Sequence, residues 1–320
     1  MLNYHPVEAA DAAWAVPLLE MSGSLSCEYA FVTIFMWSHV YHTRIARYKD
    51  WVVARSDGHH SLHYLYPAGQ GDEREVLEEI LAEAKADGRR LVLFSLSEAM
   101  KERLEGWFPG QFSIREARDN ADYLYNTADL RDLAGKKYQK KRNHAARFER
   151  ENPDWAFHEI TPEAMPQIRQ FNNEWCQLYD HRDEAGIQAE HRAIELVFRH
   201  YEELGLKGGY LTAGGQVVAF SFGSRINALA FDTHVEKARY DLDGAYAVIN
   251  REMARAFGGP YQYINREDDL GEEGLRTSKL SYHPARLEVK YLACLKDGRE
   301  EEPLPARSES LFPPPRTGQE

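Results

Sequence analysis

The sequence has 320 residues, and at about 100–200 residues per domain this length predicts two domains. Hydrophobic residues make up 43% and aromatic residues 12%, so the chain has enough apolar surface for folded cores and a wholly disordered protein is excluded. The formal net charge of −12 argues against a general coat of nucleic acid or anionic lipid, unless basic residues gather in one patch.

No stretch approaches the ~18 apolar residues that a membrane span needs, and the N-terminus lacks the basic flank and apolar core of a signal peptide. We therefore expect a cytoplasmic protein with no transmembrane segment. The cysteines lie far apart with no C-x-x-C spacing, so we expect reduced thiols and no metal site. They are Cys27, Cys176 and Cys294.

Hydrophobic periodicity predicts the elements of the first half in chain order. They are helices near 11–21 and 26–37, strands near 41–47, 51–55 and 62–66, a helix around 76–84, a strand at 91–95, a helix at 98–106 and a strand at 112–115. We expect a further strand, 122–126, to close the first sheet.

A basic segment lies near the middle of the chain. Residues 136–150 contain seven Lys or Arg and one Glu, a local charge of +6, in a run of helix formers that stops at Asn152-Pro153. We predict a helix over 130–151 that connects two domains. Its basic stripe suits either the phosphates of a tRNA or a solvated connector. The residues predicted to contact RNA are Lys136, Lys140, Lys141, Asn143 and Arg147.

Hydrophobic periodicity in the second half predicts the element order ααβββαβαβ. Its elements are helices near 161–178 and 194–204, a β-hairpin at 209–222, a strand at 228–237, a helix at 245–257, a strand at 261–264, a helix at 272–280 and a strand at 287–292. The tail at 297–320 contains several prolines, and we expect it to be disordered.

The two halves share this element order with little sequence identity, as an ancient duplication leaves them. The order is that of the GNAT acyltransferase fold. We therefore expect an α+β (mixed α/β) protein of two tandem GNAT-like acyl-CoA N-acyltransferase domains, each a mixed, mostly antiparallel sheet flanked by helices. The expected boundaries are 1–129 for a degenerate N-terminal domain, 130–151 for the connecting helix, 152–296 for a C-terminal domain with the active site, and 297–320 for the tail.

Several short motifs carry a family resemblance. They are KYQKKRNH at 137–144, HVEKA at 234–238, GAY at 244–246, IN at 249–250, INREDDLG at 264–271, GLR at 274–276 and KLSYHP at 279–284. With these motifs the chain resembles the phosphatidylglycerol lysyltransferase C-terminal-domain family over roughly residues 25–292. The resemblance implies tandem GNAT domains similar to those of Fem-type transferases. It also implies an amino acid taken from aminoacyl-tRNA. The lipid-modifying enzyme of this family has a membrane-spanning half that this sequence lacks, which puts a lipid acceptor in doubt.

The loop at 239–244 bears on the donor. In coenzyme-A-dependent GNAT enzymes, small residues here let backbone N–H groups close on a pyrophosphate. In this chain Leu242 replaces the first glycine, and Asp241 and Asp243 place negative charge there. The departure favours a donor other than coenzyme A, although either Asp also suits a helix N-cap. Arg239, Gly244 and Tyr246 are the predicted substrate-binding residues of this segment.

The strand before that loop carries three titratable residues. Because side chains alternate along a strand, we expect Asp232, His234 and Glu236 to share one face. Transfer to an amine needs a base, and a partly buried carboxylate or imidazole can supply it. We predict Glu236 as the base, with His234 as the alternate. A solvated face with an ordinary ion pair is the structural alternative.

The segment after the next strand completes the predicted site. Arg276 and Lys279 are three residues apart on a helix and are predicted to hold a phosphate or carboxylate. Tyr282 lies where GNAT relatives often place a tyrosine that protonates the leaving group. The alternative is a structural salt-bridge cluster. The loop residues predicted to bind substrate are Asn265, Arg266, Glu267 and Asp268.

These features predict an acyltransferase that moves an aminoacyl group from aminoacyl-tRNA to an amine or hydroxyl of a small molecule, lipid or peptide. A coenzyme-A-dependent N-acyltransferase and a non-catalytic RNA- or metabolite-binding protein are the alternatives. We expect no tightly bound cofactor, and tRNA as a partner. The amino acid, the acceptor and the oligomeric state do not follow from the sequence.

Overall fold

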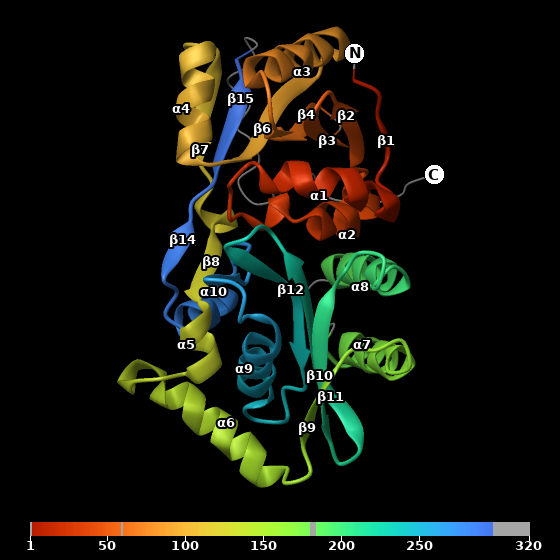
Figure 1. The fold of residues 1–320 in the computed structure, drawn as a ribbon, viewed down its shortest axis with the longest axis vertical. Helices are drawn as coiled ribbons and strands as arrows, with labels where there is room; N and C mark the ends of the chain where they lie inside the picture. Colours follow the sequence, from red (N-terminus) through yellow and green to blue (C-terminus); the bar gives the residue numbers. More distant parts are fainter. Residues whose placement is uncertain (1, 59, 180–183, 297–320) are drawn as a thin grey trace. The chain divides into compact units, whose positions relative to one another are not determined.

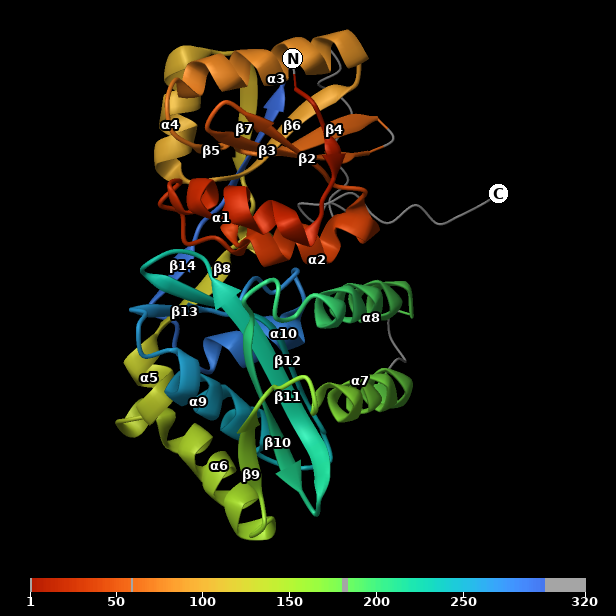
Figure 2. The same ribbon diagram turned by 45° about the vertical axis from the view of Figure 1, so that its right-hand side comes forward.

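The computed structural model describes residues 2–58, 60–179 and 184–296, and the chain forms two compact units (Figures 1 and 2). Of the described residues, the first unit comprises those up to Asp122, the segment Asp268–Glu272 and residues 288–296. The second comprises Tyr123–Glu267 and Glu273–Leu287. The predicted tail at 297–320 lies outside the described residues. Within the described part, no helix combines the length and apolar character needed to cross a bilayer.

The first unit is built around one mixed sheet. Its strands are β1 (His5–Pro6), β2 (Arg44–Tyr48), β3 (Trp51–Asp57), β4 (Ser61–Leu65), β5 (Ala68–Gly69), β6 (Arg90–Leu96), β7 (Phe112–Glu116) and β15 (Tyr291–Leu295). Its helices are α1 (Ala12–Glu20), α2 (Phe31–Tyr41), α3 (Glu73–Asp87) and α4 (Glu98–Trp107). The strand order is β1-β2-β3-β4-β6-β15-β7, with β5 on β3, and only β4 and β6 pair in parallel. Helices α1 and α2 cover one face and α3 the other (Figures 1 and 2).

The second unit has its own sheet, in the order β14-β8-β13-β12-β11-β10-β9. These strands are β8 (Asp122–Asn126), β9 (Ala156–Glu159), β10 (Lys207–Ala213), β11 (Gln216–Arg225), β12 (Ala230–Ala238), β13 (Tyr263–Asn265) and β14 (Arg286–Glu288). The helices are α5 (Thr127–Asp132), α6 (Gln139–Glu151), α7 (Met165–Tyr179), α8 (Glu184–Arg199), α9 (Ala245–Phe257) and α10 (Glu273–Leu280). The mixed sheets and flanking helices confirm the predicted GNAT-like α+β class.

Helices pack on both faces of the second sheet. On one face α9 and α6 share a core with the strands, in which Phe148 and Val248 are fully buried. On the other face, rings from α7 and α8 pack on β11, because Phe171 and Phe198 each place a ring centroid 5.9 Å from that of Phe220. Both faces of β11 and β12 are therefore covered, as their nearly continuous burial requires (Figure 2).

Two strands pair differently from the sequence prediction. The strand predicted to close the first sheet, β8, instead lies between β13 and β14 in the second. The predicted last strand divides into β14 and β15, and β15 inserts between β6 and β7 of the first sheet. The units are therefore not the contiguous blocks 1–129 and 152–296. Side-chain alternation tells which face of a strand is buried, but not which strand will be its neighbour.

The helix predicted over 130–151 is interrupted. Helix α5 ends at Asp132. The next residue, Leu133, has a φ of 49°, and Gly135 has a φ of 82°. Both values lie in the left-handed region, so a right-handed helix cannot continue through them. A short 3-10 turn (Lys136–Tyr138) then leads into α6, which ends at Glu151 as predicted. Because Ala145 and Phe148 pack against α9, α6 is part of the second unit and not a connector between domains.

Candidate functional site

The candidate site lies where two strands of the second sheet part. Strand β12 pairs with β13 only from Ala230 to Asp232, and β13 ends at Asn265. The remaining length of β12, to Ala238, has no β13 partner. The strands therefore diverge beyond Asp232, and the following residues of β12 are available to side chains from neighbouring elements.

A β-bulge changes which faces the titratable residues occupy. Phe222 of β11 opposes Val235, but the next residue, Gly223, opposes Thr233, so His234 is the extra residue on β12. Beyond the bulge, Lys237 lies against α8 through Glu190, with 2.9 Å between Nζ and Oε2.

Glu236 consequently points the other way, toward α9, where Asn250 donates to its Oε2 across 2.9 Å. His234 instead has its ring 6.5 Å from that of Phe222, on the α8 face. The prediction that Asp232, His234 and Glu236 share one face is therefore wrong. The sequence pattern gave no sign of the extra residue.

His234 and Asp232 are enclosed. The His234 Nε2 lies 2.7 Å from the Ser224 hydroxyl, and its Nδ1 lies 3.3 Å from Glu267 Oε1 and 3.4 Å from Asp232 Oδ2. The side chains of His234 and Asp232 are 1% and 0% exposed. This arrangement favours a positioning role for both residues.

Glu236 is the centre of another group of polar side chains, which we call the Glu236 cluster. Its Oε1 lies 2.6 Å from Nη2 of Arg266, while Asn250 holds its other oxygen. The two charged side chains are 9% and 12% exposed. Burial alone would lower the pKa of the Arg266 guanidinium, but the Glu236 carboxylate raises it overall, so Arg266 stays protonated.

Aromatic rings and a second cation surround that pair. Arg266 lies over the rings of Tyr282 and Tyr125, with Cζ 4.7 and 5.7 Å from their centroids. Lys141 of α6 places its Nζ 3.7 Å from the Tyr282 centroid. Among the described residues, no carboxylate lies within 4 Å of that ammonium group. Burial and the nearby Arg266 lower the pKa of Lys141 to about 8.

The cluster also contains polar atoms without protein partners. Ser221 Oγ, Asn250 Oδ1 and Arg266 Nη1 are buried, and no hydrogen bond to them is found among the described residues. All three belong to residues beside Glu236, since Ser221 opposes it across the β11–β12 pair. Buried polar groups are almost always hydrogen-bonded, so unmet groups gathered around one carboxylate indicate a place for a polar ligand or water.

Other predicted residues form the frame of the cluster. Lys279 is buried and donates from Nζ to the Arg266 carbonyl across 2.6 Å, and the Tyr125 hydroxyl donates to the Lys279 carbonyl across 2.7 Å. Asn265 accepts from the Glu267 backbone N–H across 2.6 Å, which supports the positive φ of 56° at Glu267. Lys279 therefore positions Arg266, whereas its predicted partner Arg276 is half-buried on α10.

Two further predicted residues contact other partners. Asp268 belongs to the first unit, where its carboxylate accepts from the Asn120 amide across 3.5 Å. The ring of Tyr246, in the first turn of α9, lies 5.5 Å from that of the exposed Tyr240. Burial raises the pKa of the Tyr246 hydroxyl, so it keeps its proton.

The loop at 239–244 packs against α6. Gly244 has a φ of 91°, and a Cβ added there would lie 2.1 Å from the His144 carbonyl oxygen. Asp243 lies 2.7 Å from both His144 Nδ1 and Arg147 Nη1, and Arg239 pairs with Asp241. The backbone at the start of α9 is thus covered by a helix, where a coenzyme A pyrophosphate would need open N–H groups.

The predicted RNA-contacting residues divide into two groups. Lys136, Lys140, Asn143 and Arg147 are exposed along α6 and the turn before it. Arg147 is already paired with Glu151 as well as Asp243. Lys141 turns inward to Tyr282 and belongs to the Glu236 cluster.

Sequence reasoning did not select Asn250, Ser221 or Tyr125 as site residues. The signal for Asn250 was its position on α9, four residues after Tyr246 and three before Met253, on the stripe that is otherwise buried and apolar. A polar residue on such a stripe needs a buried partner, which Glu236 provides. Ser221 and Tyr125 carried no comparable signal.

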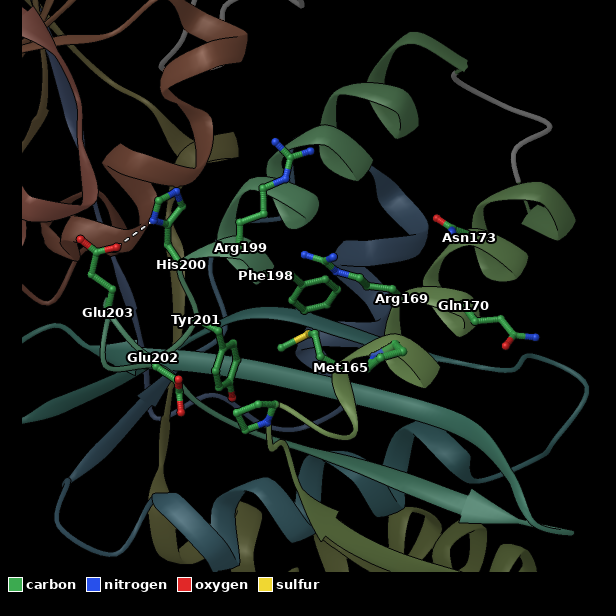
Figure 3. A pocket seen from close by; sticks show the side chains of 12 residues that line it. Met165, Arg169, Gln170, Asn173, Phe198, Arg199, His200, Tyr201, Glu202 and Glu203 are labelled. Carbon is green, nitrogen blue, oxygen red and sulfur yellow. Dashed lines mark hydrogen bonds and ion pairs between the residues drawn. The ribbon is translucent and has the colours of Figure 1, made fainter.

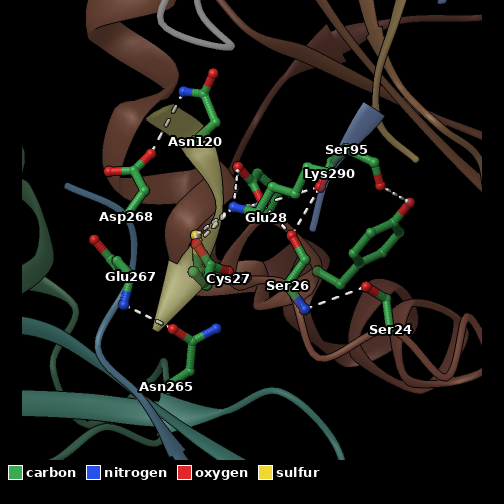
Figure 4. A network of polar contacts seen from close by, with 12 residues as sticks. Ser24, Ser26, Cys27, Glu28, Ser95, Asn120, Asn265, Glu267, Asp268 and Lys290 are labelled. Atoms are coloured by element: carbon green, nitrogen blue, oxygen red, sulfur yellow. Dashed lines mark hydrogen bonds and ion pairs between the residues drawn. The ribbon is translucent and has the colours of Figure 1, made fainter. Parts of the chain in front are cut away.

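A second polar network lies inside the first unit (Figure 4). Lys290 donates to Glu28 across 2.8 Å and to Asp122 across 2.6 Å, and Glu28 also accepts from Ser95. Cys27, Glu28 and Asp122 have the spacing of metal ligands, but the Lys290 ammonium group already lies among them. This network therefore fits a structural role.

Comparison with known proteins identifies the family of this chain. The family model described as phosphatidylglycerol lysyltransferase, C-terminal, matches residues 20–294. A conserved protein of unknown function from Bacteroides thetaiotaomicron is 38% identical over 92% of this chain and all of that chain, with a TM-score of 0.89. An uncharacterised protein, MYCGA3080, from Mycoplasmoides gallisepticum is 24% identical over 58% of this chain, and the match spans 60% of that protein.

More distant solved structures share the fold. The C-terminal domain of a putative lysylphosphatidylglycerol synthetase from Agrobacterium fabrum has a TM-score of 0.66 at 15% identity, over 91% of this chain and 93% of that one. FemX has a TM-score of 0.59 at 7% identity, over 92% and 98% of the two chains. Because the family model covers most of the sequence, the chain belongs to the family of phosphatidylglycerol lysyltransferase C-terminal domains.

Proposed function

We propose that this protein transfers an aminoacyl group from aminoacyl-tRNA to an amine or hydroxyl acceptor, at the cluster around Glu236. The observation that carries the proposal is the combination of Glu236, Arg266 and Lys141 at the open part of β12. It supplies a carboxylate, an excess positive charge and unmet polar groups in one place. Membership of a lysyltransferase family and the shared fold with FemX support this reaction class.

The reaction makes simple chemical demands. The acceptor nitrogen or oxygen attacks the carbonyl carbon of the aminoacyl ester, a C–N or C–O bond forms, and the ester C–O bond breaks. The proton of the nucleophile passes to a base, and the ribose oxygen that leaves takes up a proton. The site therefore needs a proton acceptor, a hydrogen-bond donor for the leaving oxygen and a group that holds the anionic donor.

The residues of the cluster suit these roles. Glu236 is the proton acceptor, since each carboxylate oxygen has a lone pair beyond those facing Arg266 and Asn250. Burial raises the pKa of Tyr282, despite the lowering effect of Arg266, so this hydroxyl remains protonated and can donate to the leaving oxygen. Lys141 holds an anionic group of the donor, because no carboxylate among the described residues forms an ion pair with it.

Coenzyme A is the weaker donor candidate. The contact between Gly244 and the His144 carbonyl, together with the Asp243 pairings, covers the start of α9. Coenzyme A would have to displace α6 in order to place its pyrophosphate there. The same packing is compatible with a donor that approaches along β12.

The test is a transfer assay with two labelled donors. Purified protein is incubated with a small-molecule and lipid extract and either tRNA charged with labelled amino acids or labelled acetyl coenzyme A. We expect label from aminoacyl-tRNA to enter a product, with stoichiometric release of uncharged tRNA. Transfer from acetyl coenzyme A alone would overturn the proposed donor. No transfer from either donor would favour a binding protein.

Paired variants test the role of Glu236. Glu236→Gln keeps the shape and the acceptor oxygen for Arg266 but removes the base, so turnover should fall by about 10²–10⁴-fold. Glu174→Gln is the matched control, because Glu174 is exposed on α7. If Glu236→Gln retains full turnover, Glu236 has only a structural role.

A further inference from the structure

A hollow on the second unit lies apart from the Glu236 cluster in both its residues and its chemistry. It has a volume of about 880 Å³ and is formed by the start of α7 and the end of α8 (Figure 3). Its apolar lining includes Met165, Phe198 and Tyr201, and its charged lining consists of Arg169, Arg199, Glu202 and Glu203. Pockets with an apolar lining and a few convergent polar groups are the common form of a small-molecule site.

Arg169 is the group that gives this hollow its chemistry. Its guanidinium lies over the Phe198 ring, with Cζ 5.9 Å from the centroid. Its nearest carboxylate, Glu195, is 3.6 Å from Nε, which is too far for a hydrogen bond. Among the described residues, no hydrogen bond to the Arg169 guanidinium is found, although its side chain is only 35% exposed.

Arg169 forms an ion pair with Glu195 at Nε but no hydrogen bond among the described residues, and it lies over an aromatic ring. Its planar fork can therefore still receive two carboxylate oxygens of a ligand. Glu195 already lies close to Nε. A ligand with one negative charge therefore fits better than a phosphate monoester with two. The apolar lining next to Arg169 suits a hydrocarbon chain.

We infer that this hollow binds a medium-chain carboxylate, with its head on Arg169 and its chain against Met165 and Phe198. Arg199, which has no ion pair among the described residues, lines the hollow together with Glu202 and Glu203 and partly offsets their charge. This site is independent of the proposed transfer reaction. It uses no residue of the Glu236 cluster.

Titration calorimetry of the full chain with decanoate tests the inference. We expect saturable binding at one site, at least about tenfold tighter than binding of decan-1-ol or decyl phosphate. Equal or tighter binding of either comparison compound would overturn the carboxylate assignment. Absence of saturable decanoate binding would overturn the site.

Variants locate the ligand. Arg169→Gln should weaken decanoate binding by at least about tenfold, and Arg150→Gln, an exposed arginine on α6, should leave it unchanged. Asn173→Trp places a large side chain on an exposed position of the lining and should block binding without a change in the core. Unchanged affinity in both Arg169→Gln and Asn173→Trp would overturn the inference.

Sedimentation of the same samples examines another occupant. A monomer–dimer equilibrium that Asn173→Trp abolishes, with no effect of decanoate, would assign the hollow to a second copy of the chain and overturn the ligand inference. We expect instead that decanoate binds with no change in sedimentation.

Discussion

Lys290 in the first unit and Lys141 in the second have opposite surroundings. Lys290 is 1% exposed and lies between the carboxylates of Glu28 and Asp122. Burial alone would lower its pKa, but Asp122 and the other acidic neighbours raise it well above the usual value. Lys141 faces an aromatic ring and Arg266, and its pKa falls to about 8. Two carboxylates pair with the Lys290 ammonium group, whereas the Lys141 ammonium group has no ion pair among the described residues.

The difference separates structural from functional charge. A buried ion must be neutralised by the fold itself, because an unpaired charge in the interior costs several kcal/mol. The Lys290 network meets this requirement with hydrogen bonds at every member (Figure 4). The Lys141 cluster does not, since Ser221, Asn250 and Arg266 keep unmet polar atoms. Three unmet polar atoms beside one carboxylate, at the open part of β12, are the combination that marks the candidate site.

The largest expected effect comes from removing Lys290. Lys290→Met leaves Glu28 and Asp122 buried without their cation, so the free energy of unfolding should fall by about 3–5 kcal/mol. Chemical denaturation followed by circular dichroism measures it. Arg74→Gln is the control, because Arg74 and Glu78 form an exposed pair, and its loss should cost about 0–1 kcal/mol. Equal effects of the two variants would contradict the assignment.

The position of Lys290 also shows what sequence patterns cannot predict. Periodicity predicted the helices and strands of the second half in order, and the structure confirms α7, α9, α10 and β10 to β13 close to their predicted ranges. Helix α8 (Glu184–Arg199) begins and ends earlier than the predicted 194–204. It did not predict that Lys290 and the strand after it join the first unit. Such pairing depends on partners more than a hundred residues away in the chain, which local patterns do not encode.

The candidate site was predictable in part for the same reason. Glu236, Arg266 and Tyr282 came from motifs, and the structure brings all three together. The orientation of Lys141 depends on the break at Leu133–Gly135 that sets the direction of α6, and the separation of His234 from Glu236 depends on one bulge. Both are local departures from regular geometry. Hydrophobic periodicity cannot predict them, because it assumes regular helices and strands.

Removing Lys141 should affect function more than stability, unlike Lys290. Lys141→Met keeps the apolar stem over Tyr282 and removes the charge, so the kcat/KM of transfer should fall by about tenfold to a hundredfold. The free energy of unfolding should change by no more than about 0.5 kcal/mol, because no carboxylate loses a partner. A loss of stability comparable with that of Lys290→Met would show that Lys141 is structural.

The pKa of Lys141 predicts a pH dependence. With a pKa of about 8, Lys141 loses its proton as the pH rises through that value, and with it the charge that holds an anionic donor. The KM for aminoacyl-tRNA should therefore rise above about pH 8. In Lys141→Arg this rise should disappear, since a guanidinium stays charged. A rise of equal size in both proteins would assign the titration to another group.

The smallest expected effects concern α6, and they compare two of its exposed cations. Lys140 has no ion pair among the described residues, whereas Arg147 is paired with Glu151 and Asp243. Arg147 must leave its carboxylates before it can contact a phosphate. Its contribution to the counterions released when tRNA binds should therefore be smaller than that of Lys140. Lys140→Gln should therefore reduce the salt dependence of tRNA binding by about one phosphate contact, and Arg147→Gln by less. Filter binding at several salt concentrations measures both slopes.

If Arg147→Gln changes the slope as much as Lys140→Gln does, tRNA displaces the Asp243 contacts on binding and moves α6 away from Gly244. Equal slopes for both variants and the unmodified protein would remove α6 from the tRNA surface.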